Sequence, residues 1–264
     1  MVEAKENANY TCHRASGPLK IDGNLDKEVW ARAPRTPRFG AMSSGDLTLF
    51  DTRTAALWDD RHLYVAFWLE ERDVWSTQEE RVGLAWSDNT AEVFIAGQGA
   101  YYNLSVNPEN RTTEMFVIWK DSYLRNGRYD VPEFDLAVHR PSVLGGDAGK
   151  DHPRGMRWVF SHWQFPGLET AVQVDGTLNR RGDIDRGWTV EIAFPWQGMT
   201  RLEEDPIPPQ GGDVWRIGFA RTEVIDQRAS RYTAMWAPYP MGESDMHLPE
   251  EYPTVTFSPA TADG

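Results

Sequence analysis

Glu92 is an ionisable residue within the otherwise apolar run Ala91–Ala96, and a tryptophan, Trp86, precedes it by six positions. A carboxylate accepts two hydroxyl donors at once, and such charge-assisted hydrogen bonds are stronger than neutral ones. An indole face binds flat apolar ligand faces at little cost in conformational entropy. Together these two residue types could hold a ligand with a flat apolar face and hydroxyl groups, such as a polyol.

The alternation of side chains predicts where Glu92 points. In Ala91–Ala96 the residues Val93 and Ile95 form a core face, which leaves Glu92 on the other face. The next predicted strand, Tyr101–Asn107, carries hydrogen-bonding groups opposite its apolar face: Tyr101, Asn103, Ser105 and Asn107. If the two strands are neighbours, Glu92 joins this row and a polyol site results. Plain solvent exposure of that face would explain the same alternation.

The elements that position these residues are mainly strands. β-rich runs separated by turn residues predict an all-β, antiparallel, jelly-roll-like β-sandwich. One short N-terminal helix is expected at Leu25–Ala33, with Asn24 as its N-cap. Residues 139–166 are rich in Gly, Pro and His and predict a long loop insertion. We expect one domain over residues 1–264. Further predicted strands are Thr52–Trp58, His62–Leu69, Thr113–Trp119, Thr170–Asp175, Trp188–Phe194, Val214–Thr222, Tyr232–Trp236 and Thr254–Phe257.

The composition excludes several classes of partner. The 264 residues carry a formal net charge of −13 without a cluster of Lys and Arg, which argues against binding to nucleic acid or anionic membranes. Cys12 is the only cysteine, so an intrachain disulfide and a thiolate metal site are excluded. The first residues lack the pattern of a signal peptide. The compartment stays open: secreted or periplasmic if a signal was removed, otherwise cytoplasmic.

Seven short motifs, in order along the chain, resemble the carbohydrate-binding modules of family 9 (CBM9), within the wider group of DOMON-like β-sandwiches. Each motif is mostly structural, and their common order makes the resemblance specific. They are IDGNLDKEVW (21–30), LWDDRHLYVAF (57–67), SDNTAEVFI (87–95), YYNLSVNPEN (101–110), TAVQVDGTLN (170–179), GWTVEIAFPW (187–196) and WRIGFARTE (215–223).

The resemblance implies non-catalytic binding of an oligo- or polysaccharide, with preference for the reducing ends of β-linked glucans and xylans. It implies a sugar clamped between two tryptophans, which match Trp86 and Trp236 in this chain. Glu92 and Asn107 match the residues that bond its hydroxyls. Ser105 stands where some binders have a basic residue, so detailed specificity does not carry over. Arg221 and Glu223 predict either a buried ion pair or, for Arg221, a ligand contact.

Three other functions follow from residue types. Oxygens at Asp22, Asn24 and Asp26 could bind the calcium that some family 9 modules carry, although helix capping is the favoured role there. Met246 and His247 match the axial ligands of haem proteins in the wider superfamily, but the chain has no C-x-x-C-H motif. A glycan-active enzyme is the main alternative, because 40 acidic residues could include a catalytic pair. Residues 139–166 would then shape its cleft.

Overall fold

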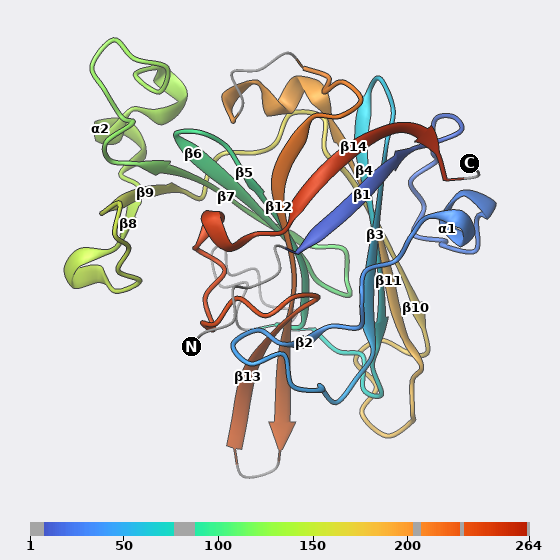
Figure 1. Ribbon diagram of the computed structural model, residues 1–264. Helices are drawn as coiled ribbons and strands as arrows, with labels where there is room; N and C mark the ends of the chain where they lie inside the picture. Colours follow the sequence, from blue (N-terminus) through green and yellow to red (C-terminus); the bar gives the residue numbers. More distant parts are fainter. Residues whose placement is uncertain (1–7, 77–87, 203–206, 228–229, 263–264) are drawn as a thin grey trace, which may run out of the picture.

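The computed structural model describes residues 8–76, 88–202, 207–227 and 230–262. Figure 1 shows two packed groups of strands with short helices at their edges. The strands are β1 Asn9–Arg14, β2 Gly40–Ala41, β3 Thr52–Trp58, β4 His62–Glu70, β5 Thr90–Ala96, β6 Ala100–Val106, β7 Thr112–Trp119, β8 Ser142–Leu144, β9 Arg157–Phe160, β10 Glu169–Asp175, β11 Gly187–Pro195, β12 Val214–Gln227, β13 Ser230–Ala237 and β14 Thr254–Thr261. The α-helices are α1 Glu28–Arg32 and α2 Leu136–His139, and 3₁₀ turns lie at Pro132–Phe134, Gly146–Ala148, Trp196–Arg201 and Pro249–Glu251.

The long strand β12 joins the two layers of the sandwich. Its first residues, Val214–Arg216, pair with β14 at the end of the layer β10-β11-β4-β3-β1-β14, which we call the first sheet. Its next residues pair with β5 and open the layer β12-β5-β6-β7-β9-β8, which we call the second sheet. β13 continues from β12 as a hairpin that projects from the body (Figure 1), and β2 pairs with β13. The predicted β-sandwich is therefore confirmed.

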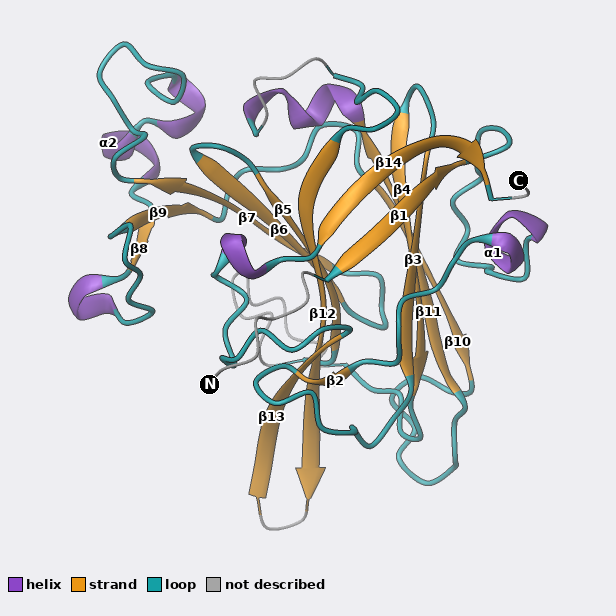
Figure 2. Cartoon of the chain, viewed as in Figure 1, coloured by secondary structure: helices purple, strands orange, loops and turns teal. Residues whose placement is uncertain are grey.

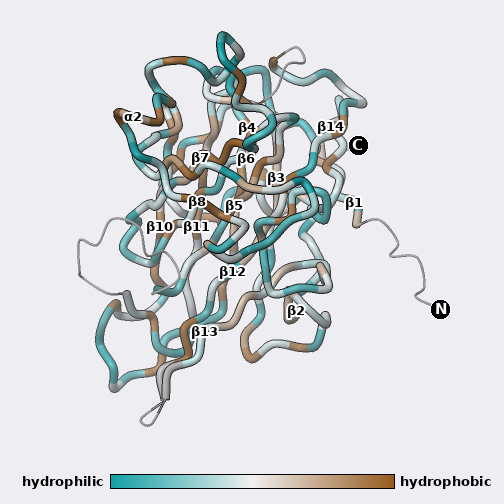
Figure 3. The backbone as a smooth tube through the Cα atoms, turned by 90° about the vertical axis from the view of Figure 1, so that its left-hand side faces the viewer, coloured by the Kyte–Doolittle hydropathy of each residue, from teal (hydrophilic) through white to brown (hydrophobic). Residues whose placement is uncertain are grey.

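Alternation along the strands places the main hydrophobic core between the two sheets. Val93 and Ile95 are buried in it together with Trp188, Val190, Ile192 and Phe194, as the alternation predicted. Hydrophobic stretches run along the strands in Figure 3, and the helical segments lie around the sheets in Figure 2. One strand departs from the expected antiparallel pattern, because β1 runs parallel to both β3 and β14.

Two predicted segments differ from the structure. The helix begins at Glu28 rather than Leu25, and its N-cap position is Lys27. The Asn24 side chain instead accepts a hydrogen bond from the Asp26 N–H at 2.9 Å and so stabilises a turn. Residues 139–166 are not a plain loop, because they contain β8 and β9. β9 pairs with β7 and widens the second sheet, so the polar composition of this segment concealed two sheet strands.

Within the described residues, none of the helices reaches the length and apolar character that a bilayer crossing requires.

Candidate functional site

Glu92 lies on the outer face of the second sheet, where four polar side chains surround its carboxylate. Oε1 accepts hydrogen bonds from the hydroxyls of Thr222 at 2.5 Å and Thr90 at 3.1 Å. Oε2 accepts one from the Ser105 hydroxyl at 3.2 Å and a longer contact from the Asn103 amide at 3.5 Å. Ser105 lies directly opposite Glu92 on β6, so the row of hydrogen-bonding groups predicted from the sequence is present. We call these five residues the Glu92 cluster.

The Glu92 cluster is buried, so solvent exposure of this face does not explain the alternation. Glu92 is 6% exposed and Asn103 is fully buried. Burial raises the pKa of Glu92, and the hydroxyl donors from Thr222, Thr90 and Ser105 act against that rise. A buried carboxylate without partners would destabilise the fold by several kcal/mol, on the order of 2–7 for an unpaired polar group. Its neutral donors offset part of that cost without a cation.

One polar atom in the cluster lacks a partner. The Asn103 side-chain oxygen is buried and accepts no hydrogen bond from the described residues. Buried polar atoms are almost always paired in native structures, and exceptions call for an explanation such as a ligand or water. An amide oxygen beside a carboxylate offers two acceptors for neighbouring hydroxyls of one sugar.

Asn107 is engaged at the end of β6. Its side-chain oxygen accepts hydrogen bonds from the N–H groups of Glu109 and Arg111, which holds the turn between β6 and β7. Its amide nitrogen donates to the Asp88 carboxylate at 3.0 Å. Asn107 therefore fixes the entry to β5, close in sequence to Glu92, and its second N–H donor has no acceptor among the described residues.

Arg221 forms the buried ion pair that was one of its two predicted roles. Its guanidinium binds Glu223 at 2.6 Å and Glu71 at 2.8 Å, and the side chain is fully buried. It also donates to the Thr52 hydroxyl and to the Glu70 carbonyl. All five donors point into the interior between the sheets, away from the Glu92 cluster.

Trp236 packs on this ion-pair group and does not face Glu92. It is 4% exposed, and the Arg221 guanidinium lies 4.8 Å from its ring centre. Phe50 packs against the same ring. Trp236 pairs with Arg221 across β12 and β13, whereas Glu92 pairs with Ala220. Adjacent residues of a strand point to opposite faces, so Trp236 and Glu92 lie on opposite faces of the sheet. Trp86, the other predicted platform, lies outside the described residues.

Met246 is buried and His247 is half-buried in the loop before β14, which covers part of the outer face of the second sheet. The His247 ring packs on Phe94 and Tyr101, and its Nδ1 lies 2.9 Å from the Tyr101 hydroxyl. Met246 packs with Phe94 and Tyr252 in the same cluster. Both side chains are thus used in packing within the described part of the chain.

Comparison with known proteins agrees with this fold. Residues 21–123 match the family model described as "Carbohydrate family 9 binding domain-like". A CBM9 module from Caldicellulosiruptor kristjanssonii, solved in complex with cellotriose, has a similar fold: TM-score 0.54, 15% sequence identity, 95% of this chain and 94% of that chain covered. Residues 21–123 thus resemble a CBM9-like domain in sequence, and the whole chain shares the fold of a CBM9 module. A crystal structure of a putative carbohydrate-binding protein from Bacteroides uniformis ATCC 8492 is also similar: TM-score 0.55, 13% identity, 96% and 100% covered. No curated protein matches the sequence significantly.

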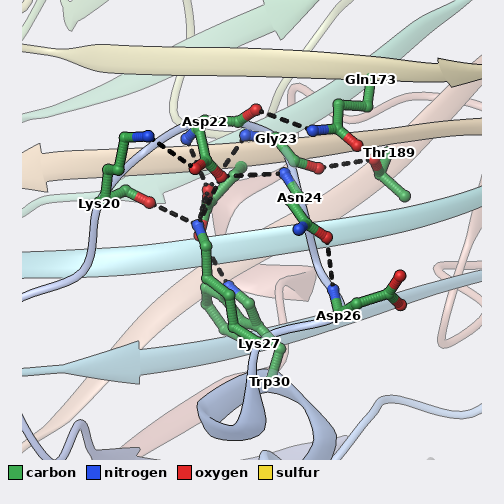
Figure 4. Close-up of polar contacts among 10 residues, drawn as sticks. Lys20, Asp22, Gly23, Asn24, Asp26, Lys27, Trp30, Gln173 and Thr189 are labelled. Carbon is green, nitrogen blue, oxygen red and sulfur yellow. Dashed lines mark hydrogen bonds and ion pairs between the residues drawn. The ribbon is translucent and has the colours of Figure 1, made fainter.

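Glu191 ties the segment before α1 to the outer face of the first sheet. Figure 4 shows polar contacts of this segment, including those of Asp22, Gly23, Lys27 and Trp30. Glu191 is fully buried on β11 and accepts hydrogen bonds from the N–H groups of Asp22 and Gly23 and from the Trp30 indole. The Lys27 ammonium reaches both of its oxygens at 2.6–2.7 Å. The sequence showed Glu191 only as a polar residue on a half-buried strand, and its partners more than 160 positions away could not be seen.

This arrangement bears on the calcium expectation. The Lys27 ammonium also lies 2.9 Å from the Asp22 carboxylate, and this contact lowers the pKa of Asp22 to about 2. The positive charge beside Asp22 and Glu191 is therefore an ammonium of the chain itself. Among the residues that the structure describes, no group of three or more His, Cys, Asp and Glu side chains is arranged to hold a metal ion.

Proposed function

We propose that the chain binds an oligo- or polysaccharide without catalysis, at the outer face of the second sheet that carries the Glu92 cluster. The observation that carries the proposal is a buried carboxylate ringed by neutral hydrogen-bonding groups, beside an amide oxygen without a partner. Hydroxyl groups of a sugar are donors and acceptors of the same kind as the Thr, Ser and Asn groups already there. A neutral polyol therefore matches this face better than a cation or an anion does.

The proposal gives each predicted residue a role. Glu92 accepts sugar hydroxyls, chiefly at Oε2, where the Asn103 contact is at the limit of a hydrogen bond. Ser105 and Asn103 complete the polar floor. Trp86 stacks on the sugar, a role taken from the family resemblance and from its place just before β5. Asn107 supports the site through Asp88, and Trp236 and Arg221 stabilise the core beneath it.

The fold comparison suggests which sugar to test first. The C. kristjanssonii module with a similar fold was solved with cellotriose. Because identity to that module is 15%, the resemblance supports the class of ligand and leaves the linkage to experiment. Cello- and xylo-oligosaccharides are therefore the first ligands to titrate.

Calorimetric titration of cellotriose tests the proposal with a matched pair of variants. Glu92→Gln should weaken binding by about tenfold or more, because charge-assisted hydrogen bonds contribute roughly 1.5–3 kcal/mol. Glu114→Gln is the control: burial raises the pKa of both carboxyls, but Glu114 lies opposite Leu104 on the core face. Trp86→Ala should abolish binding. Equal affinity of wild type and Glu92→Gln for every sugar that binds would show that this face is not the site.

A further inference from the structure

The outer face of the first sheet is only half covered, and its open half holds a cavity of about 580 Å³. The covered half lies under α1 and the segment before it, where Trp30 and Leu25 pack on Ala55, Ala66 and Tyr64. The Glu191 contacts hold that segment in place (Figure 4). Asn24, Leu25 and Asp26 form one wall of the cavity. The volume falls within the range of roughly 300–1,000 Å³ that is typical of small-ligand sites.

The floor of the cavity is a row of four cross-strand neighbours. Arg53 on β3 lies opposite Trp68 on β4, which lies opposite Thr189 on β11, which lies opposite Gln173 on β10. The Gln173 amide donates to the Asp22 carbonyl, and the Thr189 hydroxyl donates to the Gly23 carbonyl. These two hydrogen bonds tie the floor to the residues that lead into the wall. The floor thus combines an indole with two neutral hydrogen-bonding side chains.

Arg35 supplies an exposed cation at this cavity. Its guanidinium lies 3.8 Å from the Trp68 ring centre and makes no hydrogen bond or ion pair with the described residues. Arg35 and Arg53 both line the cavity; partial burial and the charge of Arg53 lower the pKa of Arg35, against the opposing charge of Asp51. The other two arginines that line the cavity have carboxylate partners, Arg53 with Asp51 at 3.3 Å and Arg186 with Asp175 at 3.6 Å, so Arg35 is the cation that an added anion would pair with.

The Arg35 guanidinium favours a planar anion. Its carbon lies over the Trp68 ring, and its planar fork of N–H donors matches a carboxylate, which can accept two of them side by side. The carboxylates of Asp26, Asp51 and Asp175 line the same cavity and would accept hydroxyl donors. A ligand that carries one carboxylate and several hydroxyls satisfies both kinds of group.

From this cavity we infer a second binding site, for an acidic sugar of the uronate class, with its carboxylate on Arg35 and its hydroxyls toward Thr189, Gln173 and the rim carboxylates. The site is separate from the Glu92 cluster, which belongs to the other sheet. It does not depend on the function proposed for that cluster.

An NMR titration of the full chain with D-glucuronate, D-glucose and acetate tests this inference. Glucuronate should shift the indole signal of Trp68, assigned with Trp68→Phe, and Arg35→Ala should weaken this binding by about tenfold or more. Arg35→Lys keeps the charge but not the planar donors and should give an intermediate loss. Arg125→Ala, which removes an exposed charge after β7, should bind like wild type.

Several results would overturn the second site. Binding of glucuronate to Arg35→Ala with unchanged affinity would remove Arg35 from it. If glucose bound as tightly as glucuronate, the carboxylate of the ligand would have no role in binding. If acetate bound as tightly as glucuronate, the hydroxyls of the ligand would have no role. Glu92→Gln should leave glucuronate binding unchanged, so the two sites can fail independently. A thermal unfolding midpoint of Arg35→Ala equal to that of wild type confirms that exposed Arg35 is not needed for folding.

Discussion

Glu92 and Trp236 lie on opposite faces of the second sheet, although the family resemblance implied that both contact one sugar. β12 separates them: Ala220 pairs with Glu92, and the next residue, Arg221, pairs with Trp236. This single-residue offset directs Trp236 into the interior, onto the Arg221 guanidinium. The proposed sugar site therefore relies on Trp86 and the Glu92 cluster, and Trp236 belongs to the core.

Replacing Trp236 by alanine should cost stability. The variant removes a buried indole and uncovers one face of the Arg221 group, and Trp-to-Ala changes in cores typically destabilise by about 3–5 kcal/mol. Urea unfolding followed by circular dichroism measures the loss. Tyr232→Ala on the same strand is the control, since Tyr232 is 57% exposed and should change stability little. A Trp236→Ala variant that keeps its stability but loses sugar binding would restore Trp236 as a platform.

The sequence predicts the core faces of β5, β6 and β11 because their apolar residues alternate, and those faces are observed. β13 lacks this signal: Tyr232 is exposed and Trp236 is buried, yet both lie on one face of the strand. The register between β13 and β12 decides which way Trp236 points, and this register depends on tertiary contacts rather than on the local sequence. The helix start was missed for a related reason, because Lys27 is held by Glu191 across more than 160 residues. Local capping rules contain no information about such a partner.

Breaking the Lys27–Glu191 pair should destabilise the fold strongly. Lys27→Met leaves a fully buried carboxylate without its cation, and removal of one partner of a buried pair typically costs about 3–5 kcal/mol. The double variant Lys27→Met/Glu191→Gln should recover part of the loss, because no uncompensated charge remains. Lys20→Met is the control, since Lys20 is 83% exposed. Denaturant unfolding of wild type, Lys27→Met, Glu191→Gln and the double variant gives the coupling. A Lys27→Met loss as small as that of Lys20→Met would contradict this account.

Glu71 should make the protein less stable as the pH rises. Burial and the neighbouring Glu223 raise the pKa of Glu71 to about 8, against the opposing effect of Arg221. A raised pKa means that the folded state holds this proton more tightly than the unfolded state does. Its contribution is therefore complete below about pH 4.5 and is lost as the pH rises toward 8. Glu71→Gln should flatten stability across this window, and Glu70→Gln, at the exposed neighbour, should not. Stability profiles that coincide for wild type and Glu71→Gln would contradict the shift.

His247 should have the opposite effect on the acidic side. Burial lowers the pKa of His247 to about 4, and Lys150 and Arg157 lower it further while Asp245 opposes them. Because the unfolded state binds the proton first, stability falls as the pH drops from about 6.5 to 4, by at most about 3 kcal/mol. His247→Gln should remove this slope, and His162→Gln, at an exposed histidine, should retain it. The measurement is urea unfolding between pH 7 and pH 4 (roughly the window set by the two pKa values). If His247→Gln kept the full slope, the acid sensitivity would have to come from the carboxylates, and the packing of His247 between Phe94 and Tyr101 would not be its cause.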